Sequence, residues 1–484
     1  MDFPDSADYW LTRFCFQRAL GFIYLIAFLI ALNQWLPLLG EKGIIPVRLF
    51  LKRVQFRRAP SLFWLNGSDR FAMVLISFGV ALSALAVTGA SDSWGLAVSM
   101  IVWALLWLLY LSLVNVGQIF YGYGWETLLL ESGFLAIFLG SSDTRPPVIV
   151  MWLLLWVLFR VMFGAGMIKI RADPCWRDLT CMFYHYETQP LPNPLSWFFH
   201  HLPKPVHKAE VLLTHFVELI VPVFYFAPPP LGYIAGALTI FFQLGLMLSG
   251  NLSWLNWITI VLCIPCFDDA LLSRLIPIDY SVPESSPLFH QVAVSALAVV
   301  VLALSWRPTR NLFSRRQLMN ASFEPLHLVN SYGAFGGVTR ERFEVAVEGT
   351  DAALPDETAD WREYEFKGKP GNPRRRPCVV SPYHYKLDWQ MWFAAMSPYW
   401  EHAWFVNFVA KLLRGDRRVL KLLAHNPFPD APPKYIRARR YRYRFTAFGE
   451  PKWWHRTVAG NYFEPVSLND PKFQELLRRQ GWFE

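Results

Sequence analysis

The sequence predicts an α-helical polytopic membrane domain followed by a β-rich, sandwich-like soluble domain with added helices. Of the 484 residues, 54% are hydrophobic and only 17% are charged, and the mean hydropathy is +0.25. The apolar residues gather in blocks of about 18–24, the helix length that crosses about 30 Å of hydrocarbon. Because this pattern stops near residue 310, we expect a multi-span membrane domain at 1–310 and a soluble domain at 311–484.

About nine apolar segments are expected to be transmembrane helices, because a lipid-embedded backbone must satisfy its own N–H and C=O groups. The fourth segment is the most polar, since it contains Gln118, Glu126 and Glu131. Trp and Tyr side chains near the segment ends suit the bilayer interface. The nine segments are 19–39, 71–90, 94–114, 117–139, 148–168, 210–228, 231–249, 252–267 and 288–306.

The charge distribution points to a membrane surface. The formal net charge is +9, and the basic residues lie at the segment ends. Membrane lipid is therefore the expected partner, and nucleic acid is not, because no nucleic-acid-binding motif is present. The most basic loops follow the first, fifth and ninth segments. The positive-inside rule alone places these loops, and the soluble domain, in the cytoplasm.

The soluble domain begins where turn residues multiply and short alternating runs appear. Alternation over 342–347, 361–366 and 440–445 predicts strands. In the last run, arginines alternate with Tyr, Tyr and Phe, so the aromatic side chains should share one strand face. Helices are expected at about 388–396, 403–424 and 471–480, and Asp470-Pro471 is a typical start for the last of these.

Three charged residues in the apolar segments could carry chemistry. Glu126 and Glu131 are costly inside lipid, so they could form a buried acid, a proton relay or a substrate handle. The simpler interpretation places Glu126 at the interface and pairs Glu131 with Arg160 or Lys169. Lys169 could act as a base in a partly apolar site, although lysines at such positions more often reach to the headgroups.

The loop after the fifth segment contains further candidates. Cys175 and Cys181 could form a disulfide on an oxidising side of the membrane, or remain free thiols on a reducing side. Residues 184–194 are rich in hydrogen-bonding side chains and stiffened by prolines, so they could form a docking surface or line a cavity. Cys263 and Cys266 have redox-motif spacing but no suitable context, and we interpret them as packing residues. No metal-site spacing is present.

Seven strings of the sequence are distinctive: WETLLLESGF at 125–134, DPCWRDLTC at 173–181, YHYETQPLPNP at 184–194, LVNSYG at 328–333, WREYEF at 361–366, LDWQMWF at 387–393 and NPFP at 426–429. These strings resemble the lipase maturation factor family, and the resemblance extends over nearly the whole chain. It implies a multi-pass protein of the endoplasmic reticulum membrane that helps secreted lipases fold and assemble. It also implies that the C-terminal domain faces the lumen.

These strings define the candidate site residues. We expect client-binding or structural roles for residues in the first, third and sixth strings, and a disulfide between Cys175 and Cys181. We also expect Glu131, Lys169 and the 184–194 loop to converge on one cavity. In this arrangement Glu131 pairs with Arg160 or faces a polar cavity, and Lys169 and His185 line the cavity mouth. The client-binding or structural candidates are Trp125, Glu126, Glu131, Tyr184, His185, Tyr186, Glu187, Gln189, Asp388 and Trp389.

A more distant similarity supplies an alternative. Residues 165–170 are similar to the Ala-Gly-Val-Lys-Lys-Leu setting of the lysine base in vitamin K-dependent γ-carboxylases, which places Lys169 on that base. This reading makes the chain a membrane enzyme acting with a lipid or quinone-like cofactor, with Glu131 or His185 near Lys169. A transporter is disfavoured because no inverted repeats are evident.

The function we favour is a membrane-bound maturation or folding factor that acts by binding its client, with no cofactor. The client is an immature secreted lipase or another exported protein. For the location of the soluble domain we follow the resemblance rather than the charge rule, so we expect the endoplasmic reticulum membrane with a lumenal C-terminal domain. In a bacterial source the corresponding membrane is the inner one.

Overall fold

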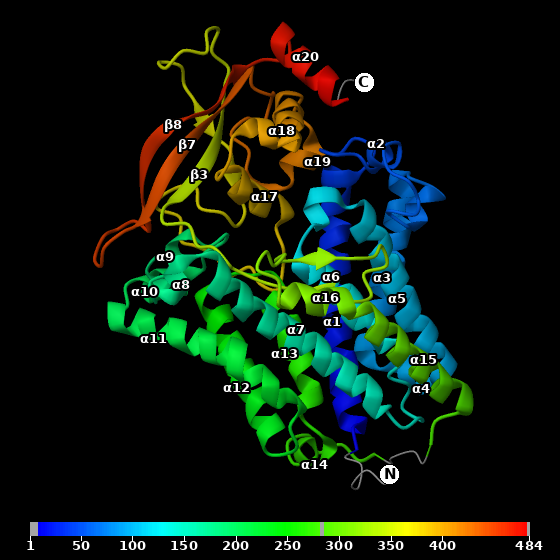
Figure 1. Cartoon of the computed structure of the whole chain (residues 1–484). Helices are drawn as coiled ribbons and strands as arrows, with labels where there is room; N and C mark the ends of the chain where they lie inside the picture. The colour runs from blue at the N-terminus through cyan, green and yellow to red at the C-terminus, as the bar shows by residue number, and fades with distance from the viewer. Residues whose placement is uncertain (1–7, 281–284, 482–484) are drawn as a thin grey trace.

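A computed structural model describes residues 8–280 and 285–481. The N-terminal part is a bundle of helices, and the C-terminal part sits on one end of this bundle (Figure 1). Helix α1 (Trp10–Leu39) runs the height of the bundle and ends close to the C-terminal part. The start of α1 and the large β-sheet therefore lie at opposite ends of the molecule.

Six helices in the described residues are long and apolar enough to cross a membrane, and a seventh is obtained if one bent pair counts as a single span. The bent pair is α15 (Leu288–Leu304) with α16 (Trp306–Leu312), at an angle of 41°. The expected count of nine is not confirmed. The six are α1, α3 (Asp69–Thr88), α5 (Leu96–Val116), α7 (Val148–Ala172), Lys204–Phe226 (α11 Lys204–His215, η3 Phe216–Ile220, η4 Val221–Phe226) and α12 (Leu231–Ser249).

Two of the nine apolar segments form helices that are too short to span. The segment at 117–139 breaks into η2 (Gln118–Tyr121) and α6 (Gly124–Ala136), separated at Gly122. The 13 residues of α6 rise only about 20 Å at ~1.5 Å per residue. The segment at 252–267 forms α13 (Leu255–Cys263) and η5 (Ile264–Cys266). Both are apolar because they lie in the interior of the bundle.

Close helix contacts in the bundle use small residues. Gly79 of α3 lies against the ring of Phe28 of α1, where a Cβ would approach a ring carbon to 2.4 Å. Gly21 of α1 similarly faces Ala86 of α3. Small residues at helix contacts allow the backbones to approach closely in a membrane. The short connecting helices are α2 (Val47–Leu51), η1 (Leu62–Trp64), α4 (Ala90–Ser93), α8 (Pro174–Arg177), α9 (Met182–Thr188), α10 (Pro194–His200) and α14 (Asp269–Leu272).

The C-terminal part contains an antiparallel sheet with the strand order β4-β3-β7-β8. Its strands are β4 (Arg362–Glu363), β3 (Arg342–Thr350), β7 (Tyr435–Phe445) and β8 (Trp454–Val466). Two small ladders pair β1 (Ala321–Ser322) with β2 (Asn330–Ser331), and β5 (Glu365–Phe366) with β6 (Leu423–His425). The helices are α17 (Lys386–Ala394), η6 (Tyr399–Glu401), α18 (Ala403–Leu413), α19 (Arg417–Leu420) and α20 (Pro471–Gln480).

The expectation of a β-sandwich is therefore wrong, because a sandwich needs a second sheet that faces the first. Within the described residues one four-stranded sheet is present, and α17 and α18 take the place of a facing sheet (Figure 1). Strand alternation identified one apolar face correctly but carried no information about what covers it. The strand-containing character of the C-terminal part is confirmed.

Local predictions in the C-terminal part hold where a short-range signal exists. In β7, Tyr441, Tyr443 and Phe445 are buried and Arg444 is exposed, as the alternation predicted. Helix α20 has the predicted bounds, and the Asp470 carboxylate accepts hydrogen bonds from its first backbone N–H groups. The expected helix at 403–424 instead ends at Leu413, because Gly415 follows with a φ of +61°.

Candidate functional site

The first cluster of candidate residues joins α6 to α17. Glu126 is fully buried, and one of its oxygens accepts a hydrogen bond from Lys386 Nζ at 2.7 Å. Its other oxygen accepts a short hydrogen bond from the Tyr110 hydroxyl. Lys386 also donates to the Phe120 carbonyl at 2.9 Å. Glu126 is therefore half of a buried ion pair between the two parts of the chain.

Aromatic rings surround this ion pair. The Trp125 and Trp389 rings meet edge-to-face at 5.0 Å, and the Tyr123 ring stacks on Trp125 at 4.5 Å. His384 packs edge-on against all three of these rings and is completely buried. Burial, and the nearby Lys386 charge, lower the pKa of His384 well below its usual value. The imidazole is therefore neutral and acts as a packing ring.

The second cluster surrounds Glu131, which is 1% exposed. Glu131 forms an ion pair with Arg160, so the expected pairing of these two residues is confirmed. Three further donors reach the same carboxylate: the Asn330 backbone N–H at 3.0 Å, the Asn330 side chain at 2.9 Å and the Tyr332 hydroxyl at 2.6 Å. Strand β2 is thus bound to the membrane part by a carboxylate inside the helical bundle.

Lys169 belongs to a third cluster. Its Nζ lies 2.6 and 2.7 Å from the two oxygens of Glu218, and both side chains are buried. The π-helical turn η3 contains Glu218, and such turns shift the side-chain direction within a helix. Glu131 and Lys169 therefore do not pair with each other, since each has its own oppositely charged partner.

His185 lies near the Lys169 cluster. It is 8% exposed, and its ring contacts the Phe335 ring at 5.5 Å. Burial and the Lys169 charge lower the pKa of His185 to about 4. Lys169 and His185 are thus electrostatic neighbours, as expected, but both lie in packed surroundings rather than in an open mouth.

The 184–194 segment is a packed link rather than an open docking loop. Residues 188–194 are all buried, while Tyr184 and Glu187 are half-buried. Arg342 of β3 donates to the carbonyls of Glu187 and Pro190 at 3.0 Å each, and also to that of Gln189. Tyr186 is buried against the Phe199 ring at 5.4 Å.

Further hydrogen bonds fix this link from both sides. The Glu187 carboxylate accepts from the Phe445 backbone N–H at 2.7 Å, and Gln189 Nε2 donates to the Ser249 carbonyl at 2.8 Å. From α17, Trp392 Nε1 donates to the Thr188 carbonyl at 3.1 Å. The segment therefore bridges α12, the sheet and α17.

Asp388 stabilises a turn within the C-terminal part. It is 1% exposed, and one of its carboxylate oxygens accepts from the backbone N–H groups of Gly368 and Lys369 at 2.5 and 3.0 Å. Burial raises the pKa of Asp388. Asp388 and Trp389 thus have different roles in one helix: the first holds a loop of its own domain, and the second packs on Trp125 of the membrane part.

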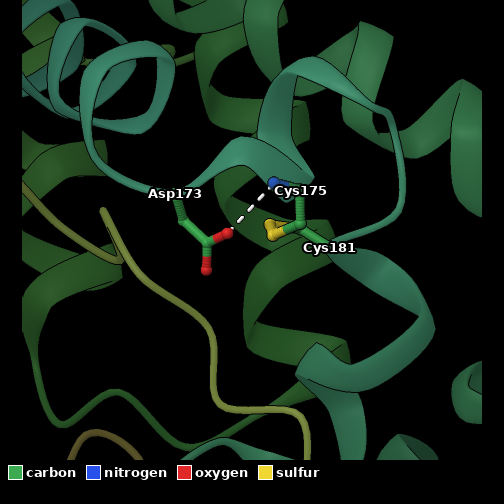
Figure 2. Close-up of side chains that lie close together, drawn as sticks. All are labelled: Asp173, Cys175 and Cys181. Carbon is green, nitrogen blue, oxygen red and sulfur yellow. Dashed lines mark hydrogen bonds between the residues drawn. A yellow bond between two sulfur atoms is a disulfide. The ribbon is translucent and has the colours of Figure 1, made fainter.

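Cys175 and Cys181 form a disulfide in the structure, beside Asp173 (Figure 2). The Asp173 carboxylate accepts from the Cys175 backbone N–H at 3.0 Å and from Arg340 at 2.8 Å. The possible metal-binding atoms of Asp173, Cys175 and Cys181 lie within 4.8 Å of one another. Because the two sulfurs are bonded to each other, neither is a thiolate that could bind a metal. The buried cysteines Cys263 and Cys266 are free.

The sequence analysis identified Glu126 and Glu131 but missed most of the residues that bind them. Lys386 was overlooked although it directly precedes the LDWQMWF string, and Asn330 and Tyr332 lie inside LVNSYG. Glu218 carried the same signal as Glu131, an acidic residue inside an apolar segment. The WETLLLESGF, LVNSYG and LDWQMWF strings thus lie where the two parts of the chain meet.

Two family models match the chain. The lipase maturation factor transmembrane domain matches residues 11–274, and the lipase maturation factor C-terminal domain matches residues 328–464. Similar proteins include lipase maturation factor 1 of Mus musculus, 45% identical over 99% of this chain and 90% of its own length. Lipase maturation factor 1 of Homo sapiens is 43% identical over 99% and 91%, and lipase maturation factor 2 of Homo sapiens is 30% identical over 97% and 85%.

No solved structure matches the chain. The carboxylase alternative gains no support from the matches, which agrees with the ion pair that holds Lys169. The matches cover nearly the full length of the chain and both of its parts, and the helices confirm an integral, multi-pass membrane protein. The chain therefore belongs to the lipase maturation factor family.

Proposed function

We propose that this protein binds immature lipases, or other exported proteins, and helps them reach their folded and assembled form. The names of its relatives supply the client class. The observation that carries the mechanism is the joint between the two parts. Its candidate residues are buried and mutually bonded, so they position the C-terminal part and leave the client to bind elsewhere on it.

The mechanism is one of binding rather than catalysis. The charged candidates Glu126, Glu131 and Lys169 are each neutralised by a buried partner. The Glu126–Lys386 pair joins the two parts directly, and the Glu131 carboxylate also accepts hydrogen bonds from Asn330 and Tyr332, so these contacts hold the C-terminal part in a fixed orientation on the end of the bundle. A fixed orientation keeps a client-binding surface next to the membrane, where a newly exported chain emerges.

We place the protein in the endoplasmic reticulum membrane, with the C-terminal part in the lumen. The family supports this location, and a disulfide between Cys175 and Cys181 is consistent with an oxidising compartment on that side. The basic loop that contains α2 lies at the same end of the molecule as the C-terminal part (Figure 1). Long basic loops of this kind can lie along the interface without obeying the positive-inside rule.

The test is complementation in cells that lack their own lipase maturation factor. We expect the full chain to raise the specific activity of a secreted lipase, measured as activity per mass of secreted enzyme. Crosslinking in the same cells should recover the immature lipase with the chain. A non-secreted reporter protein is the control. Unchanged lipase activity at normal expression of the chain contradicts the proposal.

A further inference from the structure

A groove of about 450 Å³ lies where α9, β3, β7 and the end of α17 meet. None of these elements is a candidate membrane span. The apolar side chains that line the groove are Phe343 and Trp392, both half-buried, and Met396, which is 41% exposed. Pockets of this volume bind ligands mainly through apolar lining with a few well-placed polar groups. The groove therefore offers an apolar floor on the C-terminal part.

The lining also carries arginines, and most of these are already neutralised. Arg340 pairs with Asp173 at 2.8 Å, and Arg342 pairs with Glu344 at 2.5 Å. Arg440 differs, because no carboxylate pairs with it within residues 8–280 and 285–481. Its guanidinium lies 3.9 Å from the Phe343 ring centroid, and its buried Nε has no hydrogen-bond partner there.

This arrangement defines the chemistry of a matching ligand. An unpaired guanidinium beside apolar side chains favours a carboxylate, since charge-assisted hydrogen bonds to arginine are about twice as strong as neutral ones. Phe343, Trp392 and Met396 favour apolar groups next to that carboxylate. An extended polypeptide segment that combines acidic and apolar side chains has both features.

We propose that this groove binds such an acidic and apolar segment of an incompletely folded client. Arg440 donates hydrogen bonds to the client carboxylate, and the neighbouring apolar side chains pack on Phe343, Trp392 and Met396. The proposal rests on the proposed function, because the occupant is the client polypeptide. Folding of the client buries the apolar side chains of such a segment, so release follows from folding.

The experiment uses the full chain in lipid nanodiscs and a short fluorescein-labelled peptide in which Asp alternates with Phe and Leu. Fluorescence anisotropy measures its Kd for the wild type and for the variants Arg440→Gln and Met396→Gln. We expect Arg440→Gln to weaken binding about tenfold. Met396→Gln should weaken it less, because part of the apolar floor remains.

The matched control is Arg444→Gln. Arg444 lies on the same face of β7 and is exposed, but it does not line the groove. We expect its Kd to equal that of the wild type. An equal loss for Arg440→Gln and Arg444→Gln overturns the proposal, because it shows a general charge effect. Equal affinity for a peptide with Lys in place of Asp also overturns it.

The outcomes separate this inference from the proposed function. If the wild type raises lipase specific activity in cells but does not bind the peptide, the groove proposal is wrong and the maturation role stands. If the wild type binds the peptide through Arg440 but has no effect on lipase activity, the groove proposal stands and the maturation role is wrong.

Discussion

At the scale of single residues, three acidic side chains in the helical bundle are each buried beside a cation from another helix. Glu126 pairs with Lys386, Glu131 with Arg160 and Glu218 with Lys169. Removing one member of a buried ion pair leaves an uncompensated charge, which costs about 3–5 kcal/mol. Replacing both members by uncharged residues of similar size is much less costly. These pairs therefore give predictions that differ in magnitude between single and double variants.

The variant Lys386→Met should lower the thermal stability of the purified protein strongly, by about 3–5 kcal/mol in unfolding free energy. The double variant Glu126→Gln with Lys386→Met should recover most of this loss. Intrinsic Trp fluorescence during heating measures both. The matched control is Arg479→Met, which removes an exposed ion pair with Glu475 and should change little. A single variant as stable as the control contradicts the structural role of the pair.

The disulfide between Cys175 and Cys181 is tested by chemistry on the native membrane. We expect neither thiol to react with a maleimide unless a reductant is added first, as measured by the mass of the peptide that contains both residues. The double variant with serine at both positions should lose about 2–3 kcal/mol of stability, because the closed loop is short. Free Cys378, which is half-buried, is the internal reference. Labelling of both thiols without reductant contradicts the prediction.

At the scale of elements, α9 and α10 confer a pH dependence on stability. Burial and neighbouring positive charges lower the pKa of His185 and His200 to about 4 in the folded protein. In the unfolded chain a histidine titrates near 6.5. Between these values the unfolded form binds more protons, so stability should fall as the pH falls from about 6.5 to about 4.

The measurement is the unfolding temperature at a series of pH values between neutral and about 4. The double variant His185→Gln with His200→Gln is the control, since it removes both titrating groups. We expect its stability to depend less steeply on pH than that of the wild type. Identical slopes contradict the assignment of the pH dependence to these two helices.

The elements also show what the sequence could and could not predict. Local signals were sufficient for β3, β7 and α20, because alternation and the Asp470 cap act within a few residues. Hydropathy could not distinguish α6 and α13 from spans, because a helix in the interior of a bundle is as apolar as one in lipid. The Glu131–Arg160 pair was predictable from two adjacent segments. The Lys169–Glu218 pair was not, since it depends on the π-helical turn.

At the scale of the whole molecule, the position of the C-terminal part is fixed at one end of the bundle, opposite the start of α1 (Figure 1). We expect an epitope placed after Glu484, beyond the described residues, to be protected from protease in sealed vesicles of the endoplasmic reticulum. An epitope on the N-terminal end should be digested. Addition of detergent exposes both and is the control. Digestion of the C-terminal epitope in intact vesicles shows that the positive-inside rule was right.

The ion pair between Glu126 and Lys386 sets an order of events during synthesis, because its two residues are separated by 260 positions. A ribosome adds about 5–20 residues per second, so Lys386 is synthesised roughly 10–50 s after Glu126. During this interval the helical bundle cannot reach its final form. A chain that stops before Lys386 leaves a carboxylate without its counter-charge inside the bundle. Premature termination in the second half of the chain should therefore destabilise the first half and shorten its lifetime in the cell.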